Sequence, residues 1–221
     1  MKNDFGSQKC KKMVQPLKQF WKKIQKHPQD HLNSPKNHSE FNCFLQKLEV
    51  LTLNDIYKHS LFQELFITST NVQSVEIFNN SQIIIQLIFL PPHYLFDIHD
   101  HPEMLVVLKI LLGEVDVSKF DLINQEGVYQ QIKYGQFTRG TVELKDKIRL
   151  RENEVDFVYP AVSNLHSIYT LKRTVLMDVM VNSYDFTKRP CTFFRLGENI
   201  QGDFFEIFHF DNWKLGKANF I

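Results

Sequence analysis

Apolar residues in the first part of the chain recur at helical spacing. Between residues 14 and 27 they stand three and four positions apart, at Val14, Leu17, Phe20, Trp21 and Ile24. This spacing predicts an amphipathic helix with one buried face. The same criterion predicts a second helix over residues 41–50, with Ser39 as its N-cap, and the start of a short third helix over residues 53–58. Residues 1–67 are therefore expected to form a helical segment that packs on the rest of the protein.

Residues 27–39, between the first two predicted helices, are polar and contain two prolines. Such a composition is typical of a linker or a long loop. His27 and His31 are four positions apart, which on a helix would form a metal-binding pair, but the adjacent proline argues against that helix. We interpret them, together with His38 and the later His59, as solvent-exposed loop histidines.

From about residue 68 the period of the pattern changes to that of β-strands. Residues 72–78 and 83–90 are rich in β-branched and aromatic residues and flank Asn79-Asn80-Ser81, so they predict a hairpin. Further strands are predicted over residues 105–113, 115–122, 137–144, 147–151, 155–159, 165–171 and 175–181. Short strands at regular spacing, without helices between them, are typical of an antiparallel sandwich or barrel. We expect one mainly-β domain over residues 68–221.

The composition excludes several classes of protein. The 221 residues carry a formal net charge of +1, which gives no strong electrostatic case for binding nucleic acid or an anionic membrane. No apolar run approaches the roughly 20 residues needed to cross a bilayer, and the charged N-terminus lacks the apolar core of a signal peptide. Cys10, Cys43 and Cys191 are widely scattered and support neither a disulfide framework nor a zinc-binding Cys-x-x-Cys motif. We expect a monomeric protein of the cytoplasm, or also of the nucleus.

Two histidines, His99 and His101, stand two positions apart within the β-rich region. Alternate residues of a strand point to the same face, so the two imidazoles are expected side by side. Neutral imidazole is the commonest protein metal ligand, and His166, on another predicted strand, is the candidate for a third ligand. His93 is expected at the strand mouth and His209 in edge or core packing. The alternative is a set of barrel histidines hydrogen-bonded to the backbone, because a His-x-His pair alone is a weak motif.

Three blocks of sequence around these histidines resemble one family. They are IHDHP-x-M at residues 98–104, P-x-x-x-NLH at residues 160–166, and LMDVM at residues 176–180 followed by Tyr184 and by RPCTFFR at residues 189–195. In this order and spacing they are similar to the thiol dioxygenases related to cysteamine dioxygenase and the plant cysteine oxidases. The resemblance runs from about residue 83 to residue 196.

The resemblance implies a cupin-type double-stranded β-helix, also called a jelly-roll barrel, with N-terminal helices. It also implies one Fe(II) ion held by His99, His101 and His166. General cupins place a glutamate ligand and then a glycine after the His-x-His pair, and here those positions are Val106 and Gly113. Three neutral ligands without a carboxylate distinguish such a site from the two-His-one-carboxylate iron oxygenases.

By the same resemblance, the chain is expected to add both atoms of O2 to the sulfur of a thiol and to give a sulfinic acid. The substrate would be a small aminothiol such as cysteamine, or the N-terminal cysteine of a protein, in which case the enzyme would act as an oxygen sensor. The uncompensated charge on the iron favours a soft thiolate ligand. Two rival interpretations are a zinc or nickel cupin that acts as a hydrolase or isomerase, and a cupin that only binds a ligand.

Three further residues match family positions near the site. Asp178 is expected to contact the substrate amine, or else to hold a neighbouring backbone group. Tyr184 and Cys191 are expected near the mouth of the site, and Cys191 is equally consistent with an ordinary buried thiol. Asp100, between the two histidines, points to the opposite face and is expected to be structural.

Several positions depart from the family pattern. Relatives usually have glycine where this chain has Glu103 and Ser163, a Gly-Pro-Pro run where it has Asn182-Ser183, and often tyrosine where it has Phe193. Glu103 shares strand parity with the two histidines, so we expect it to line the pocket. These departures bear on substrate choice and rate more than on the iron site.

Overall fold

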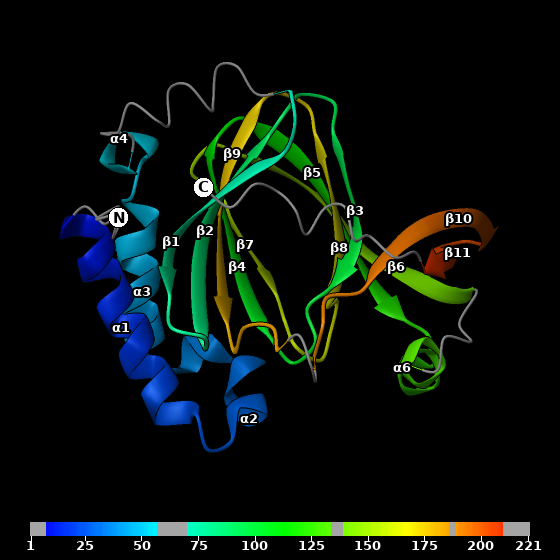
Figure 1. Ribbon diagram of the computed structural model, residues 1–221, viewed down its shortest axis with the longest axis horizontal. Coiled ribbons are helices and arrows are strands. Elements are labelled where there is room, and N and C mark those ends of the chain that lie inside the picture. Colours follow the sequence, from blue (N-terminus) through cyan, green and yellow to red (C-terminus); the bar gives the residue numbers. More distant parts are fainter. Residues whose placement is uncertain (1–7, 57–69, 134–138, 186–188, 210–221) are drawn as a thin grey trace.

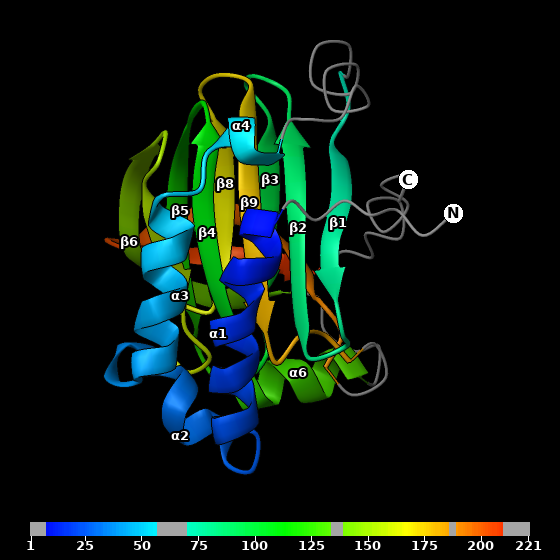
Figure 2. The ribbon, with the colours of Figure 1, turned by 90° about the vertical axis from the view of Figure 1, so that its left-hand side faces the viewer.

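Two β-sheets face each other, and helices cover the outer face of one of them (Figures 1 and 2). The computed structural model describes residues 8–56, 70–133, 139–185 and 189–209. The end of the third predicted helix and His59 lie outside the described residues. The N-terminal helices are α1 (Gln8–Ile24), α2 (Pro28–Leu32), the 3-10 helix η1 (Pro35–Asn37), α3 (Ser39–Glu49) and α4 (Leu53–Ile56). Within the described ranges, no helix is long and apolar enough to cross a membrane.

All the strand pairings are antiparallel, as the short alternating runs predict. The first sheet contains, in spatial order, β1 (Gln73–Asn79), β2 (Ile83–Leu90), β9 (Thr174–Val181), β4 (Leu105–Leu112) and β7 (Val155–Val158). The second forms a closed ring of β10 (Phe193–Gln201), β11 (Phe204–His209), β6 (Gly140–Arg151), β5 (Glu114–Leu122), β8 (Leu165–Thr170) and β3 (Leu95–Asp100). The mainly-β barrel with N-terminal helices is therefore confirmed.

Helices α1 and α3 pack on the first sheet and bury its outer face (Figure 2). Phe20, Phe41 and Phe44 project from the two helices and are fully buried. Because β4 and β9 are covered on both faces, nearly every residue in these strands is buried, and their sequences are mostly apolar, with Lys109 and Asp178 as charged exceptions. The helical segment and the sheet thus share one apolar core.

The polar segment at residues 27–39 is not the linker that its composition predicts. It forms α2 and η1, and Leu32 and Pro35 are buried. The side chain of Gln29 donates a hydrogen bond to the carbonyl of Glu103 (3.2 Å), and Asn33 Oδ1 accepts one from the amide of Ala161 (3.2 Å). Proline at the first position of a helix does not interrupt it, which explains the wrong prediction.

The histidines in this segment are also less uniform than predicted. His27 is exposed as expected, but His31 and His38 are half-buried with ring centroids 5.0 Å apart. Ser39 begins α3 as its first helical residue, and His38 occupies the N-cap position without a capping side-chain hydrogen bond.

Three features of the β region differ from the predictions. Residues 140–151 form one strand, β6, in place of two strands around a polar turn. The register between β5 and β6 shifts at Lys145, so the polar residues Lys145 and Asp146 mark a bulge within one strand and not a turn. A helix, α6 (Gln125–Lys133), lies between β5 and β6, and the β10–β11 hairpin was not predicted. In Figure 1, α6 and this hairpin lie on the side of the molecule opposite to α1 and α3.

A fully buried lysine connects the helical layer to the sheet. Lys109 lies on the helix-facing side of β4, and its ammonium donates hydrogen bonds to the carbonyls of Leu48 (2.6 Å) and Glu49 (2.8 Å). These carbonyls belong to the last turn of α3, where the helix lacks intrahelical donors and where a cation is favoured. Burial lowers the pKa of Lys109.

We predict that Lys109→Met lowers the free energy of unfolding by about 2 kcal/mol, because it removes one donor from each of two carbonyls in the last turn of α3. The carbonyl of Leu48 keeps the amide of Leu51 as a donor (3.1 Å). Urea denaturation followed by circular dichroism measures this loss. The matched control is Lys22→Met on the exposed face of α1, which should change stability by less than about 0.5 kcal/mol. Equal stabilities of the two variants would contradict the capping role.

Candidate metal centre

Two adjacent strands of the barrel bring the three predicted histidines together. His99 of β3 pairs with His166 of β8, and the amide of His101, just beyond β3, donates to the carbonyl of Asn164 (3.1 Å). Phe96 and His99 are three residues apart, yet both line the cavity. The shift in the β3–β8 register between them makes this possible. The spacing of two in the His-x-His pair therefore places both imidazoles on the inner face, as predicted.

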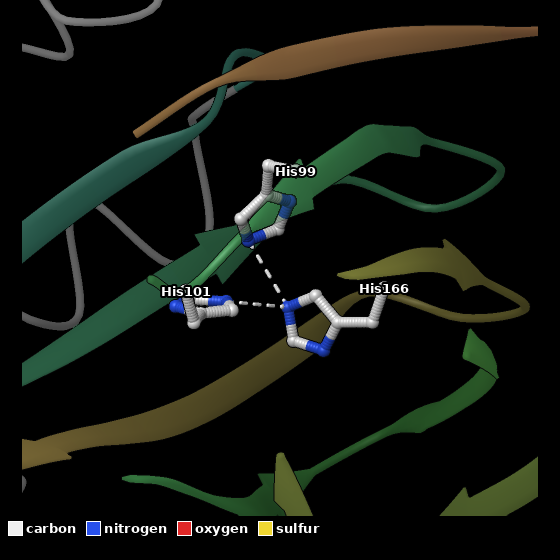
Figure 3. Close-up of side chains that lie close together, drawn as sticks. All are labelled: His99, His101 and His166. Carbon is white, nitrogen blue, oxygen red and sulfur yellow. Dashed lines mark hydrogen bonds between the residues drawn. The ribbon is translucent and has the colours of Figure 1, made fainter. Parts of the chain in front are cut away.

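The ring nitrogens of these histidines converge (Figure 3). Nε2 of His166 lies 3.0 Å from Nε2 of His99 and 3.1 Å from Nε2 of His101. The exposed fractions of the three residues are 6%, 3% and 1% for His99, His101 and His166. Among the described residues, they form the cluster of side chains that is able to hold a metal ion.

The hydrogen bonds of two rings determine where their protons lie. Nδ1 of His99 donates to the carbonyl of Asp97 (2.9 Å). The Tyr184 hydroxyl donates to the carbonyl of Asp100 (2.8 Å), so its oxygen accepts from Nδ1 of His101 (2.9 Å). With their protons on Nδ1, both rings present an Nε2 lone pair to the centre.

Electrostatics keep all three rings neutral. Burial lowers the pKa of His99 to about 4. It also lowers the pKa of His101, with His99 adding to the effect, and that of His166, with both other histidines and Lys119 adding to the effect. Lone pairs of neutral rings at this separation repel one another unless a proton or a cation lies between them, and neutral imidazole is the form that binds metal.

The donor set fits a divalent metal ion. An imidazole–metal bond of about 2.0–2.1 Å, with right angles between bonds, places ligand nitrogens about 3 Å apart, as observed for the two pairs that include His166. Val106 is fully buried on β4, and no carboxylate among the described residues joins the three histidines. The prediction of three neutral ligands and no glutamate thus agrees with the geometry.

Asp100 anchors the strand that carries the two histidines. Its Oδ2 accepts a hydrogen bond from the Tyr129 hydroxyl on α6 (2.6 Å), and its Oδ1 accepts one from the amide of Thr192 (2.7 Å). Burial raises the pKa of Asp100 to about 6. The carboxylate faces away from the imidazoles and ties α6 and the start of β10 to the centre, which agrees with the predicted structural role.

A small cavity lies beside the histidines. Its walls are mostly apolar and are formed by Ile88, Leu90, Phe96, His99, Leu108, His166, Ile168, Leu176 and Asp178. The side chain of Gln86 on β2 donates to Oδ2 of Asp178 (3.0 Å), whereas Oδ1 of Asp178 is buried and has no hydrogen-bond partner among the described residues. Burial raises the pKa of Asp178 to about 6. A substrate cation in the cavity would meet an unsatisfied acceptor.

Tyr184 and Cys191 lie behind His101 and not at the mouth of the cavity, where they were expected. Neither is among the residues that line it. Beyond β9 the chain turns at Asn182, which carries Tyr184 behind the imidazole of His101, and the Cys191 thiol donates weakly to the carbonyl of Asp100 (3.8 Å). Burial raises the pKa of both Tyr184 and Cys191, so the thiol is protonated and poorly nucleophilic.

The predicted place of Glu103 in the pocket is wrong. The turn after His101 puts Glu103 at φ 59°, which ends the strand alternation on which the prediction depended. Its side chain is 60% exposed and lies near Arg189 (Nε–Oε2 3.6 Å). Ser163 and Asn182 also have positive φ values, 53° and 62°. All three positions at which relatives usually have glycine therefore keep the left-handed conformation.

The remaining candidates lie close to their predicted places. The ring of Phe193 stacks on His99, with centroids 5.6 Å apart. His93 is exposed in the loop before β3, with Nδ1 3.4 Å from the Tyr169 hydroxyl, and His209 packs against Phe194. Gln86 was not identified as a site residue from the sequence. Its position as a polar residue within an apolar strand could have indicated it.

A closed antiparallel barrel with three histidines on its inner face is the arrangement of a cupin metal centre. The PCO_ADO family model matches residues 43–202, and the chain therefore belongs to this family of thiol dioxygenases with the cupin fold.

Similarity to individual proteins is more limited. A curated relative described as a probable 2-aminoethanethiol dioxygenase, from Dictyostelium discoideum, is 28% identical over 119 residues, which make up 52% of this chain and 52% of the relative. The chain thus spans about half the length of this relative. Among solved structures, a cupin superfamily protein from Desulfitobacterium hafniense has 16% identity and a TM-score of 0.37, covering 51% of this chain and 79% of that one. The Schizosaccharomyces pombe Cnp3 cupin domain has 13% identity and a TM-score of 0.36, covering 52% and 70%.

We predict that Ser163→Gly stabilises the protein by about 0.5–1 kcal/mol, because it relieves the cost of a left-handed non-glycine residue. Its amide, which donates to Asp121, is retained. The control, Ser118→Gly within β5, should lower stability, since glycine weakens a strand. Chemical denaturation of both variants provides the comparison, and a loss of stability in both would show that the turn carries no strain.

Proposed function

We propose that this chain is an Fe(II)-dependent thiol dioxygenase that converts a 2-aminothiol and O2 into the corresponding sulfinic acid. The reaction adds both oxygen atoms to one sulfur, R–SH + O2 → R–SO2H, and the thiol supplies the electrons, so no other reductant is required. The proposal depends on one observation: three neutral imidazoles converge beside a cavity that contains a buried carboxylate. Family membership does not favour the alternatives of a zinc or nickel cupin or a binding module.

His99, His101 and His166 would hold the metal through their Nε2 atoms. When bound, Fe(II) supplies the redox chemistry that O2 and the thiol require. Three neutral imidazoles leave the double positive charge of the ion uncompensated, a setting that favours an anionic sulfur ligand over a neutral one. Tyr184 and the carbonyl of Asp97 keep two of the rings in the required tautomer.

Asp178 would bind the ammonium group of the substrate. Its Oδ1 is buried and unsatisfied at the cavity, while Gln86 holds Oδ2 and so fixes the orientation of the carboxylate. Burial of an ionised carboxylate is unfavourable unless a cation pairs with it, and the ammonium group of the substrate would provide that cation. The mostly apolar walls lower the local dielectric constant, which strengthens this attraction.

The residues that line the cavity also constrain the substrate class. Among the described residues, the lining includes no lysine or arginine, so a free carboxylate on the substrate would have no cationic partner from this part of the chain. Cysteamine lacks that carboxylate, and in an N-terminal cysteine it is replaced by a peptide bond. The description of the Dictyostelium relative as a probable 2-aminoethanethiol dioxygenase supports cysteamine as the first substrate to test. If the N-terminal cysteines of proteins are substrates, the extent of their oxidation would depend on the oxygen concentration, and the enzyme would act as an oxygen sensor.

The direct test supplies the Fe(II)-loaded protein with cysteamine, or with a peptide that begins with cysteine, under ¹⁸O2. Mass spectrometry should show two ¹⁸O atoms in the product of one or both substrates. His166→Ala should abolish this product, because two imidazoles hold the metal poorly. Failure of the wild-type protein to oxidise either thiol, or incorporation of a single ¹⁸O atom, would refute the proposal.

We predict that Asp178→Asn reduces kcat/KM for cysteamine by about 10–100-fold, since a charge-assisted hydrogen bond contributes about 1.5–3 kcal/mol. Steady-state O2 uptake measures the effect. The control substrate is 2-mercaptoethanol, which lacks the amine and should lose far less activity in the same variant. Equal losses with both thiols would contradict the assignment of Asp178 to the ammonium group.

A further inference from the structure

Two rows of side chains face each other across the barrel interior. Residues paired across antiparallel strands point to the same face, so each row follows from the register of one sheet. The row on the first sheet consists of Gln86, Asp178, Leu108 and Asp156. The row on the second sheet consists of Phe193, His99, His166 and Lys119. The cavity lies between them and is lined by members of both rows.

A buried ion pair joins the two rows at one end. Nζ of Lys119 lies 2.6 Å from Oδ1 of Asp156 and donates a second hydrogen bond to the carbonyl of Phe157 (2.9 Å). Lys119 and Asp156 are each only 8% exposed. Lys119 is also the direct cross-strand neighbour of His166, so the pair lies next to the third histidine of the metal centre.

One donor and one acceptor remain unmatched near this pair. Nδ1 of His166 is buried and has no hydrogen-bond partner in the described part of the chain, in contrast to Nδ1 of His99 and of His101. Oδ2 of Asp156 is also buried without a partner there. When Nε2 of His166 binds a metal, the ring proton must lie on Nδ1, which then becomes a buried donor that requires an acceptor.

We propose that Asp156, held in place by Lys119, is a positioning residue for the third metal ligand: its Oδ2 accepts the Nδ1–H of His166 through one buried water molecule. This inference rests on the proposed metal centre. Metal-binding histidines nearly always donate their second nitrogen to a carboxylate, a carbonyl or water, which fixes the tautomer and the ring orientation. Lys119 balances the charge of Asp156, so the carboxylate serves as an acceptor without adding net charge near the centre.

The test compares the affinity of the whole protein for Co(II), measured by visible absorption in competition with a chelator. Single variants of Lys119 or Asp156 leave a buried charge unpaired and can lose stability for that reason. The informative variant is therefore the double substitution Lys119→Met/Asp156→Leu, which removes both charges together. We expect it to remain folded and to bind Co(II) about 10–100-fold more weakly than the wild type.

The matched control removes a carboxylate from a more exposed ion pair on β5, the strand that carries Lys119. Asp116 on β5 pairs with Arg149 (2.8 Å), and Asp116→Asn should leave Co(II) affinity within about twofold. Wild-type affinity in the double variant would overturn the inference and leave the proposed metal centre intact. Equal and weak binding by the wild type and by His166→Ala would overturn both.

A second measurement separates positioning from a merely structural role. In the Zn(II)-loaded protein, proton NMR should show a slowly exchanging Nδ1–H resonance for His166, shifted downfield by the hydrogen bond. In the double variant this resonance should move upfield or exchange faster, whereas the Nδ1–H resonance of His99, which donates to Asp97, should stay unchanged. An unchanged His166 resonance would overturn the inference.

Discussion

The central constraint of this structure is the crowding of three neutral, buried imidazoles inside the barrel, with Nε2 of His166 3.0 and 3.1 Å from the Nε2 atoms of the other two. Such crowding is unfavourable unless a cation is shared and unless each ring is held from behind. The surrounding hydrogen bonds follow from this requirement. Tyr184 holds one ring, the carbonyl of Asp97 holds another, and Asp100 ties the strand between them to α6 and β10. The mostly apolar, buried strands β4 and β9 belong to the opposite sheet.

Much of this architecture could be predicted from local pattern. The period of two places His99 and His101 on one face, and apolar runs give the strands that carry them and His166. Local pattern failed where one residue changes the backbone state. Glu103 has a left-handed φ and leaves the alternation, the bulge at Lys145 makes one strand look like two, and a proline that begins α2 was interpreted as a helix breaker. Each of these three errors arises from the backbone conformation at a single residue, which cannot be deduced from composition.

The partners of the candidate site were harder to predict than its ligands. Lys119 and Asp156 are 37 residues apart, and Gln86 and Asp178 are 92 apart, so both contacts depend on strand register and on how two sheets face each other. A sequence signal did exist. Lys119 continues the inward-facing positions of Val115 and Val117, and a charged residue at such a position requires a buried partner. The pattern indicates that a partner is needed, but only the assembled sheets identify it.

The three buried carboxylates around the centre have different roles because they have different partners. Asp100 receives hydrogen bonds on both oxygens from within the chain, and Asp156 is neutralised by Lys119. Asp178 receives a neutral hydrogen bond from Gln86, and among the described residues no cation pairs with it, although it faces the cavity. A buried carboxylate without a cation is costly to retain, and a ligand that brings its own positive charge removes that cost. Under the proposed function, the ammonium group of a 2-aminothiol would lie near Asp178 and its sulfur near the histidines, and the two groups are two carbons apart.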